Sequence, residues 1–301
     1  MFGQPKFAAL NSRINARLDE LGVLVVAHRG CGHASIATNT ALAVKAAVLS
    51  GADVVELDVS ASRDGEFFCF HDGYEPELLG LQSNLQKLTA AEIDEVSYLW
   101  VDRPGRRARV ERLLPLLRSF RDSGTLFNID RSWWRWPQLL RALRGLRMTD
   151  QLILKCPAWE EAALARLREF GVKFPFVAIC ATPEDVYRTV GDPELNTVGV
   201  ELITTTRQHP WFDPKVIAEF HNLGVFCFVN AETLNTGIPQ FGGMDDELAI
   251  EQGPESVYGA LLDLGIDAVQ TDWPWLVREV RDTRRQAVTE IGLSTARRTV
   301  G

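Results

Sequence analysis

Short apolar, β-branched runs alternate with longer amphipathic stretches along nearly the whole chain. Eight runs are expected to be strands: residues 23–27, 53–60, 125–130, 151–156, 174–180, 197–203, 225–230 and 267–272. Each is followed by apolar positions at helical spacing, and several of these stretches end on Gly, which favours the left-handed backbone after a helix. Eight strand and helix units predict a single-domain (β/α)₈ TIM barrel rather than a doubly wound open sheet.

Two connections are longer than ordinary ones, at 61–124 and 231–253. The first contains a further strand-like run, EFFCF, and a helix start at Thr89 with Glu92 three residues later. The second is rich in Gly and acidic residues and is predicted to form a lid or rim.

We therefore expect an N-terminal helix at 1–22 and a barrel domain at 23–288 that carries both insertions. Residues 289–301 are polar and are expected to form a flexible tail.

Composition narrows the class of protein. The chain is 46% hydrophobic and 24% charged, which is typical of a globular protein with a sizeable core. A net charge of −8 argues against nucleic acid as the main partner. No run reaches the roughly 18 apolar residues of a membrane span and no signal core is evident, so we expect a cytoplasmic protein without stable membrane insertion. The five scattered cysteines are expected to be reduced thiols, most of them buried.

Polar side chains stand at the ends of the first four predicted strands, where barrel active sites are built. In chain order they are His28, Arg29, Glu56, Asp58, Asp130 and Lys155.

Glu56 and Asp58 are two residues apart, so both side chains point to the same face of a strand. Carboxylates on the inward face of a barrel repel each other and lose hydration, so a cation must compensate. Their hard oxygens favour one divalent cation, Mg²⁺ or Ca²⁺, with Asp130 as a third ligand. The alternative is a buried ion pair with Arg29 or Lys155.

His28 and His71 could supply a general acid and a general base, although the sequence does not decide which is which. His71 follows the extra strand-like run, in FCFHDG. A divalent cation, Arg29 and Lys155 around two histidines suit an anionic group such as a phosphodiester. The alternative for either histidine alone is a structural role.

Five motifs resemble the glycerophosphodiester phosphodiesterases, in the order of that family: HRG at 28–30, NT at 39–40, GADVVELDVSASRDG at 51–65, FHD at 70–72 and GIDAVQTDWP at 265–274. The resemblance implies a TIM barrel that hydrolyses a small-molecule phosphodiester with a bound Mg²⁺ or Ca²⁺. It also implies that His28 and His71 are the acid/base pair and that Glu56 and Asp58 are metal ligands. In NIDRS, Asp130 takes the place of the family's third ligand.

Three departures from the family pattern stand out. Ser132 replaces the usual Lys after the third ligand, Thr38 replaces the Glu of ENT, and FCFVN lacks the usual Trp of the seventh strand. We expect Lys155 rather than Arg131 to supply the missing charge, because the residue after Asp130 should point out of the barrel. With these departures the chain resembles a bacterial branch of the family, for which sugar phosphodiesters are one candidate substrate class.

Further polar and aromatic residues near strand ends complete the candidate pocket. Glu201 and Asn230 are expected to bind substrate hydroxyls or to cap loops, and Trp273 is placed near the substrate. Among Trp133, Trp134 and Trp136, at least two are expected to pack against a helix.

Two other functions remain open. The same site would serve a phosphotransferase or a cyclising lyase that acts on sugar phosphodiesters. Thr38 and Ser132 also suit a non-catalytic barrel that binds phosphorylated ligands. The sequence does not indicate the oligomeric state.

Overall fold

The computed structural model describes the backbone of residues 1–99 and 107–298, and side chains as far as residue 287. Within these ranges eight parallel strands form the barrel: β1 (Leu24–Ala27), β2 (Val54–Ala61), β5 (Leu126–Asp130), β6 (Leu152–Pro157), β7 (Phe176–Cys180), β8 (Thr197–Leu202), β9 (Phe226–Asn230) and β10 (Ala268–Thr271). Their order is β1-β10-β9-β8-β7-β6-β5-β2, and pairing of β1 with β2 closes the ring. The predicted TIM barrel is confirmed, with strand ends displaced by no more than two residues.

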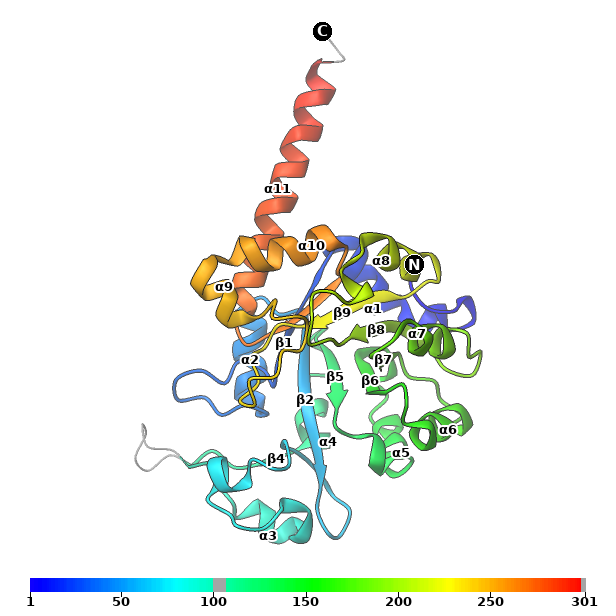
Figure 1. Cartoon of the computed structure of the whole chain (residues 1–301). Coiled ribbons are helices and arrows are strands. Elements are labelled where there is room, and N and C mark those ends of the chain that lie inside the picture. The colour runs from blue at the N-terminus through cyan, green and yellow to red at the C-terminus, as the bar shows by residue number, and fades with distance from the viewer. Residues whose placement is uncertain (100–106, 299–301) are drawn as a thin grey trace.

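Helices surround the barrel (Figure 1). They are α1 (Ala8–Leu21), α2 (Ala41–Leu49), α4 (Leu113–Ser119), α5 (Gln138–Gly145), α6 (Glu161–Glu169), α7 (Pro183–Val190), α8 (Pro214–Asn222), α9 (Asp246–Gln252), α10 (Ala260–Leu264) and α11 (Pro274–Arg298). Short 3₁₀ turns lie at Pro5–Phe7, Leu85–Lys87, Trp133–Arg135, Thr149–Gln151 and Pro210–Phe212, and single π turns at Glu75–Leu79 and Glu255–Gly259.

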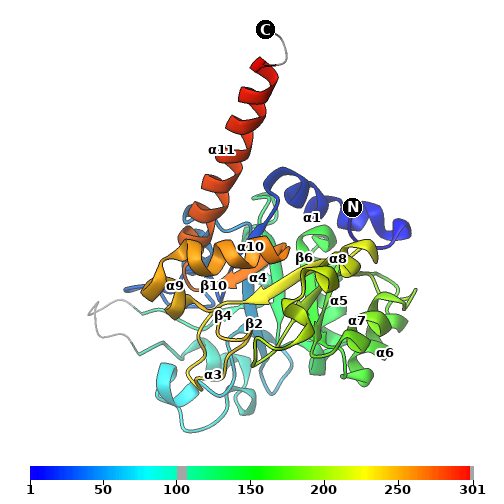
Figure 2. The ribbon, with the colours of Figure 1, turned by 45° about the horizontal axis from the view of Figure 1, so that its top comes forward.

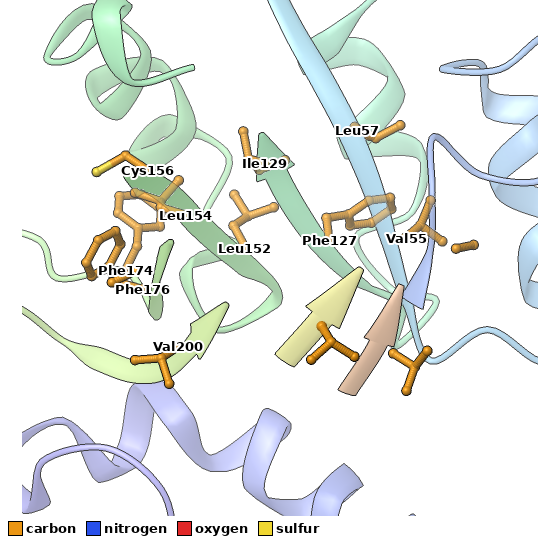
Figure 3. Close-up of a cluster of buried hydrophobic side chains, with 14 of the residues drawn as sticks. Val55, Leu57, Phe127, Ile129, Leu152, Leu154, Cys156, Phe174, Phe176 and Val200 are labelled. Atoms are coloured by element: carbon orange, nitrogen blue, oxygen red, sulfur yellow. The ribbon is translucent and has the colours of Figure 1, made fainter. Parts of the chain in front are cut away.

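The alternation along each strand separates two cores. On β2, Val55 and Leu57 face the helices and join the large outer core, part of which Figure 3 shows with Phe127, Ile129 and Leu154. Val54 instead points inward and belongs to a second apolar cluster inside the barrel.

Helix α1 closes the bottom of the barrel. Ile14 and Leu18 of this helix are buried against the inward apolar cluster, which includes Val26 of β1 and Phe228 of β9. The interior is therefore filled at its N-terminal end, and only its C-terminal end is available for a site.

The described residues between β2 and α4 form a small lobe beyond the end of β2 (Figure 1). Strands β3 (Phe67–Cys69) and β4 (Glu111–Arg112) extend β2 by antiparallel pairing, and helix α3 (Ala90–Asp94) begins at a complete capping box of Thr89 and Glu92. The lobe has its own apolar core and carries His71 to the mouth of the barrel.

Helix α11 projects away from the barrel, as both whole-chain views show (Figure 2). Its backbone continues to Arg298, while the side chains of the expected tail, 289–301, lie outside the described residues, as does the backbone of 299–301. The domain boundaries stay a prediction. No helix among the described residues is long and apolar enough to cross a membrane. All five cysteines are buried and unpaired, as expected.

Candidate active site

The C-terminal ends of the strands surround a cavity of about 280 Å³. Nine of the ten predicted site residues line it: His28, Arg29, Glu56, Asp58, His71, Asp130, Lys155, Glu201 and Asn230. Residues separated by up to about two hundred positions in the sequence therefore meet in one place. Trp273 is not among the lining residues and instead packs against His33 and Trp275, with ring centroids 5.2 and 5.1 Å away.

A tight backbone turn after β1 positions His28 and Arg29. Arg29 and Gly30 both have left-handed backbones, with φ of 52° and 72°. A Cβ at Gly30 would lie 2.8 Å from the backbone carbon of Ala43 in α2, so only glycine fits this turn without movement. The turn also directs the Arg29 backbone N–H to Oε2 of Glu56, at 2.8 Å.

His28 is held in its charged form by acidic neighbours. Its Nδ1 lies 2.9 Å from Oδ1 of Asp272, the residue that follows β10. Burial opposes the charge, but the hydrogen bond to Asp272 and the nearby Glu232 outweigh it and raise the pKa of His28 to about 9. At neutral pH His28 is a proton donor.

His71 has the opposite ionisation. Its Nδ1 lies 2.8 Å from the backbone carbonyl oxygen of Asp72 and must donate to it, which leaves Nε2 with a lone pair. Burial lowers the pKa of His71, and the charges of Arg29 and Arg131 act in the same direction against the attraction of Asp58. At neutral pH His71 is a proton acceptor.

Two carboxylates differ sharply on β2. Asp58 pairs with Nε of Arg29 at 2.8 Å and accepts from Nδ2 of Asn39 at 3.0 Å. Although burial opposes ionisation, Arg29 and the histidines hold the pKa of Asp58 below its usual value. Glu56 has a buried Oε1 without a hydrogen-bond partner, and burial together with Asp58 raises its pKa to about 8.

Lys155 links the carboxylates of β5 and β8 across the cavity floor. Its Nζ lies 2.7 Å from Asp130 and 2.8 Å from Glu201, and the side chain is 1% exposed. Asn230 donates to the other oxygen of Glu201 at 3.0 Å. Burial disfavours the ammonium, but Asp130 and Glu201 raise the pKa of Lys155 well above its usual value. The buried ion pairs weighed as an alternative to a metal are thus formed by both Arg29 and Lys155.

The donor set of Glu56, Asp58 and Asp130 fits a hard divalent cation in chemistry. The unpartnered Oε1 of Glu56 is the oxygen that most needs one. In the described part of the chain, however, three metal-ligating side chains approach within 4.8 Å of one another only at His221, Cys227 and Asp267, at the far end of the barrel. The three carboxylates would have to draw together around an ion.

Sequence reasoning missed four contributors to the site: Asn39, Glu232, Gln270 and Asp272. Asp272 and Gln270 obey the same strand-end and alternation rules as Glu56 and Asp58, so the motif QTDWP contained the signal. Glu232 lies two residues beyond Asn230 and accepts from Gln270 Nε2 at 3.1 Å, and burial raises its pKa to about 7. Nothing local distinguishes Glu232 from the other acids of its loop.

One expectation about the third strand is wrong. Arg131 lines the cavity instead of pointing out of the barrel, because β5 ends at Asp130 and Arg131 adopts a left-handed backbone with φ of 48°. Its guanidinium pairs with Asp72 at 3.0 Å. Ser132, in the place of the family's Lys, is buried and accepts from Nε1 of Trp136.

The three tryptophans after β5 have different environments. Trp136 is fully buried in the outer core and Trp133 packs partly against it, while Trp134 is 43% exposed. Trp133 also lines the cavity, and packing of at least two of these rings against a helix stays a prediction.

Comparisons with known proteins identify the family of the chain. A model of the glycerophosphoryl diester phosphodiesterase family matches residues 28–275. No curated protein sequence matches the chain significantly.

Solved structures share the fold at low identity. A glycerophosphodiester phosphodiesterase from Agrobacterium tumefaciens is 20% identical with a TM-score of 0.62, covering 85% of this chain and 98% of that chain. A glycerophosphoryl diester phosphodiesterase from Parabacteroides distasonis is 17% identical, with a TM-score of 0.68 and 87% coverage of each chain.

An Oleispira antarctica phosphodiesterase, solved in complex with its product sn-glycerol-3-phosphate, is 19% identical with a TM-score of 0.62 over 86% of this chain and 96% of that one. Because the family model spans most of the sequence, from the histidine after β1 to the first turn of α11, the chain belongs to the glycerophosphoryl diester phosphodiesterase family and is a phosphodiesterase.

Proposed function

We propose that this chain hydrolyses glycerophosphodiesters or sugar phosphodiesters, with His28 as general acid and His71 as general base. The carrying observation is that two histidines line one cavity with different partners, because Nδ1 of His28 pairs with the Asp272 carboxylate whereas Nδ1 of His71 faces the neutral carbonyl of Asp72. When two titratable groups have pKa values that are pushed apart by their environments, the group with the higher pKa is suited to be the acid and the one with the lower pKa the base.

In this scheme the neutral Nε2 of His71 removes a proton from the attacking group, either water or a neighbouring substrate hydroxyl, and His28 protonates the departing alcohol. A cyclic phosphate formed by a substrate hydroxyl is then opened by water. Asp272 orients the His28 ring and stabilises its imidazolium. His71 is fixed by the Asp72 carbonyl, so both rings are oriented without substrate.

Arg29 and Lys155 are proposed to bind the phosphate oxygens. Both are anchored by carboxylates, Arg29 by Asp58 and Lys155 by Asp130 and Glu201, which fixes their positions before the substrate arrives. Each retains N–H groups for an anion, because a guanidinium has five donors and an ammonium three.

We propose Glu56, Asp58 and Asp130 as ligands of one divalent cation, Mg²⁺ or Ca²⁺. When bound, such an ion polarises the phosphoryl group and offsets its negative charge. The buried, unpartnered oxygen of Glu56 supports this assignment, and Arg29 and Lys155 would then each share a carboxylate with the ion.

The test is incubation with glycerophosphocholine, glycerophosphoethanolamine and a sugar phosphodiester, with and without EDTA, followed by ³¹P NMR. Conversion of the diester to a monoester that stops with EDTA and returns with Mg²⁺ or Ca²⁺ is expected. Binding of these diesters without turnover under any added cation would contradict the proposal.

Hydrolysis in ¹⁸O-labelled water distinguishes direct attack by water from initial cyclisation or transfer. A single label in the first phosphorus product indicates direct hydrolysis. An unlabelled cyclic phosphate that forms first indicates attack by a neighbouring substrate hydroxyl.

A further inference from the structure

Asp246 is a buried acid behind the candidate active site. It is the first residue of α9, is 2% exposed and does not line the cavity. It belongs to the long connection at 231–253, so part of this connection lies in the interior of the molecule.

Three groups donate hydrogen bonds to the Asp246 carboxylate. Oδ1 accepts from the hydroxyls of Thr271 and Tyr258, each at 2.7 Å, and Oδ2 accepts from the Asp272 backbone N–H at 2.8 Å. The Thr271 hydroxyl accepts from the Trp273 N–H at 2.8 Å, so it has its own proton to donate to Asp246. A group that only accepts is suited to be an ionised carboxylate, although burial raises the pKa of Asp246 to about 7.

The backbone of Asp246 also holds the segment that follows β9. Its N–H donates to the Ala231 carbonyl at 2.7 Å, and the Ala231 N–H donates to the Gln270 carbonyl of β10 at 2.7 Å. Ala231 directly precedes Glu232, whose Oε1 accepts from the Gln270 side chain at 3.1 Å. Asp246 is therefore hydrogen-bonded to the backbone beside Glu232 and to the backbone of Asp272.

Glu232 and Asp272 are also the two acids that keep His28 charged. Burial disfavours the imidazolium, but the hydrogen bond to Asp272 and the charge of Glu232 outweigh it and raise the pKa of His28 to about 9. The His28 backbone N–H also donates to the Thr271 carbonyl at 3.1 Å. The other charged groups that act on His28 follow β1 or lie on β2, and they are Arg29, Glu56 and Asp58.

We propose that Asp246 is a positioning residue that fixes Asp272 and Glu232 against His28. The inference rests on the proposed function, in which His28 is the general acid, and adds the residue that keeps this acid in place and protonated. Without the Asp246 carboxylate, the Asp272 N–H and the Thr271 hydroxyl lose their acceptor. The Asp272 side chain is then held less firmly towards Nδ1 of His28, and their hydrogen bond weakens.

The first test measures the pKa of His28 by NMR of the histidine ring signals, with His28 assigned from the signal that is lost in His28→Gln. In the Asp246→Ala protein the midpoint is expected to fall by about one pH unit or more. In Asp246→Asn it should stay within about half a pH unit, because the amide oxygen accepts from the Asp272 N–H and the amide nitrogen donates to the hydroxyl oxygens. A midpoint in Asp246→Ala equal to that of the unmutated protein would overturn the inference.

Asp245→Ala is the matched control. Asp245 is the adjacent acid and caps the same helix by accepting from the Leu248 N–H at 3.0 Å. Loss of this cap is expected to lower the midpoint of urea unfolding and to leave the pKa of His28 unchanged. A pKa of His28 that falls equally in the control would show that lost stability accounts for the change, and the positioning role would be wrong.

A second variant tests the same contact with a smaller change of shape. Thr271→Val removes the hydroxyl that donates to Asp246, and circular dichroism verifies the fold of each protein. The His28 midpoint is expected to fall by about half a pH unit in Thr271→Val, and this result decides the question if the Asp246→Ala protein does not fold. An unchanged midpoint in Thr271→Val would then contradict the inference.

Kinetics separate this inference from the proposed function. In Asp246→Ala the alkaline limb of the kcat/KM profile is expected to move down together with the His28 midpoint. The loss at high pH should appear in kcat more than in KM, because Asp246 does not line the cavity. A midpoint that falls while the alkaline limb stays would support the role of Asp246 and overturn His28 as the general acid.

Discussion

At the scale of single residues, chemically identical groups of the candidate site have different environments. His28 faces Asp272 and Glu232, whereas His71 faces Arg29 and Arg131 and donates only to a neutral carbonyl. Glu56 and Asp58 diverge in the same way, since Asp58 pairs with Arg29 and Glu56 keeps one oxygen unpartnered.

The acid/base assignment predicts a bell-shaped pH dependence of kcat/KM. Activity should rise as His71 loses its proton, at a pH below the ordinary value of histidine, and fall as His28 loses its proton near pH 9. Asp272→Asn removes the charge that raises the pKa of His28. The alkaline limb should therefore move down by about one pH unit or more while the acidic limb stays.

Asp122→Asn is the control for this profile, because Asp122 is exposed in the turn before β5. An unchanged alkaline limb in the Asp272→Asn protein would show that His28 is not the acid.

Removal of the base is a second prediction at this scale. His71→Ala should lower kcat by a factor of about 10² to 10⁴, because the variant lacks Nε2 of His71, which accepts the proton of the attacking group in the proposed scheme. His209→Ala, which removes a histidine that does not line the cavity, should retain activity near that of the unmutated protein. Circular dichroism of both variants would verify the fold, and near-normal turnover by the His71→Ala protein would refute the scheme.

At the scale of elements, strands β2 and β10 lie in copies of the same sequence motif. G-x-D-x-V-x-x-D occurs at 51–58 and again at 265–272. The first Asp of each motif forms a hydrogen bond to the backbone of the neighbouring strand. Asp53 accepts from the Val25 N–H of β1 at 2.9 Å, and Asp267 accepts from the Cys227 N–H of β9 at 2.7 Å. The second Asp reaches the active end, as Asp58 and Asp272.

This pattern also explains the cluster of His221, Cys227 and Asp267. Asp267 Oδ2 accepts from His221 Nε2 at 2.8 Å and from the Cys227 backbone N–H. These hydrogen bonds hold the start of β10 against β9 and α8. At the start of β2, Asp53 forms the corresponding contact as an ion pair with Arg281 at 2.6 Å.

The turn between β1 and α2 supports a prediction about stability. Gly30→Ala places a Cβ 2.8 Å from the Ala43 backbone on a left-handed residue, whereas Gly65→Ala meets no atom within 4 Å at a φ of 95°. The left-handed backbone alone costs about 1–2 kcal/mol in each variant. Denaturant unfolding should therefore show a larger loss for Gly30→Ala, and equal losses would contradict the close packing.

At the scale of the whole molecule, the barrel has one closed end and one reactive end. Helix α1 fills the closed end through Ile14 and Leu18, and the carboxylates, cations and histidines gather at the other.

Closure of the bottom by α1 gives a further prediction. Ile14→Ala should lower the free energy of unfolding by about 2–5 kcal/mol, because Ile14 is fully buried between α1 and the barrel interior. Leu49→Ala, at a residue that is 84% exposed, should change it by no more than about 0.5 kcal/mol. Equal midpoints of urea unfolding for the two variants would show that α1 does not stabilise the barrel.

The sequence by itself determined the barrel and most of its polar end. Side chains alternate between the two faces of any strand, so the sequence of β2 alone places Val54, Glu56 and Asp58 on one face. The closed parallel topology then brings the strand ends together, which is why His28, Asp130 and Lys155 could be assigned to one site.

Only the tertiary structure decided how these groups are paired and charged. The protonation of His28 depends on Asp272 and Glu232, which lie more than two hundred positions away in the sequence. Arg131 enters the cavity because its backbone leaves the strand geometry that the alternation rule assumes. The ionisation of these groups depends on which side chains meet across the ring, and the local pattern of the chain does not indicate which ones meet.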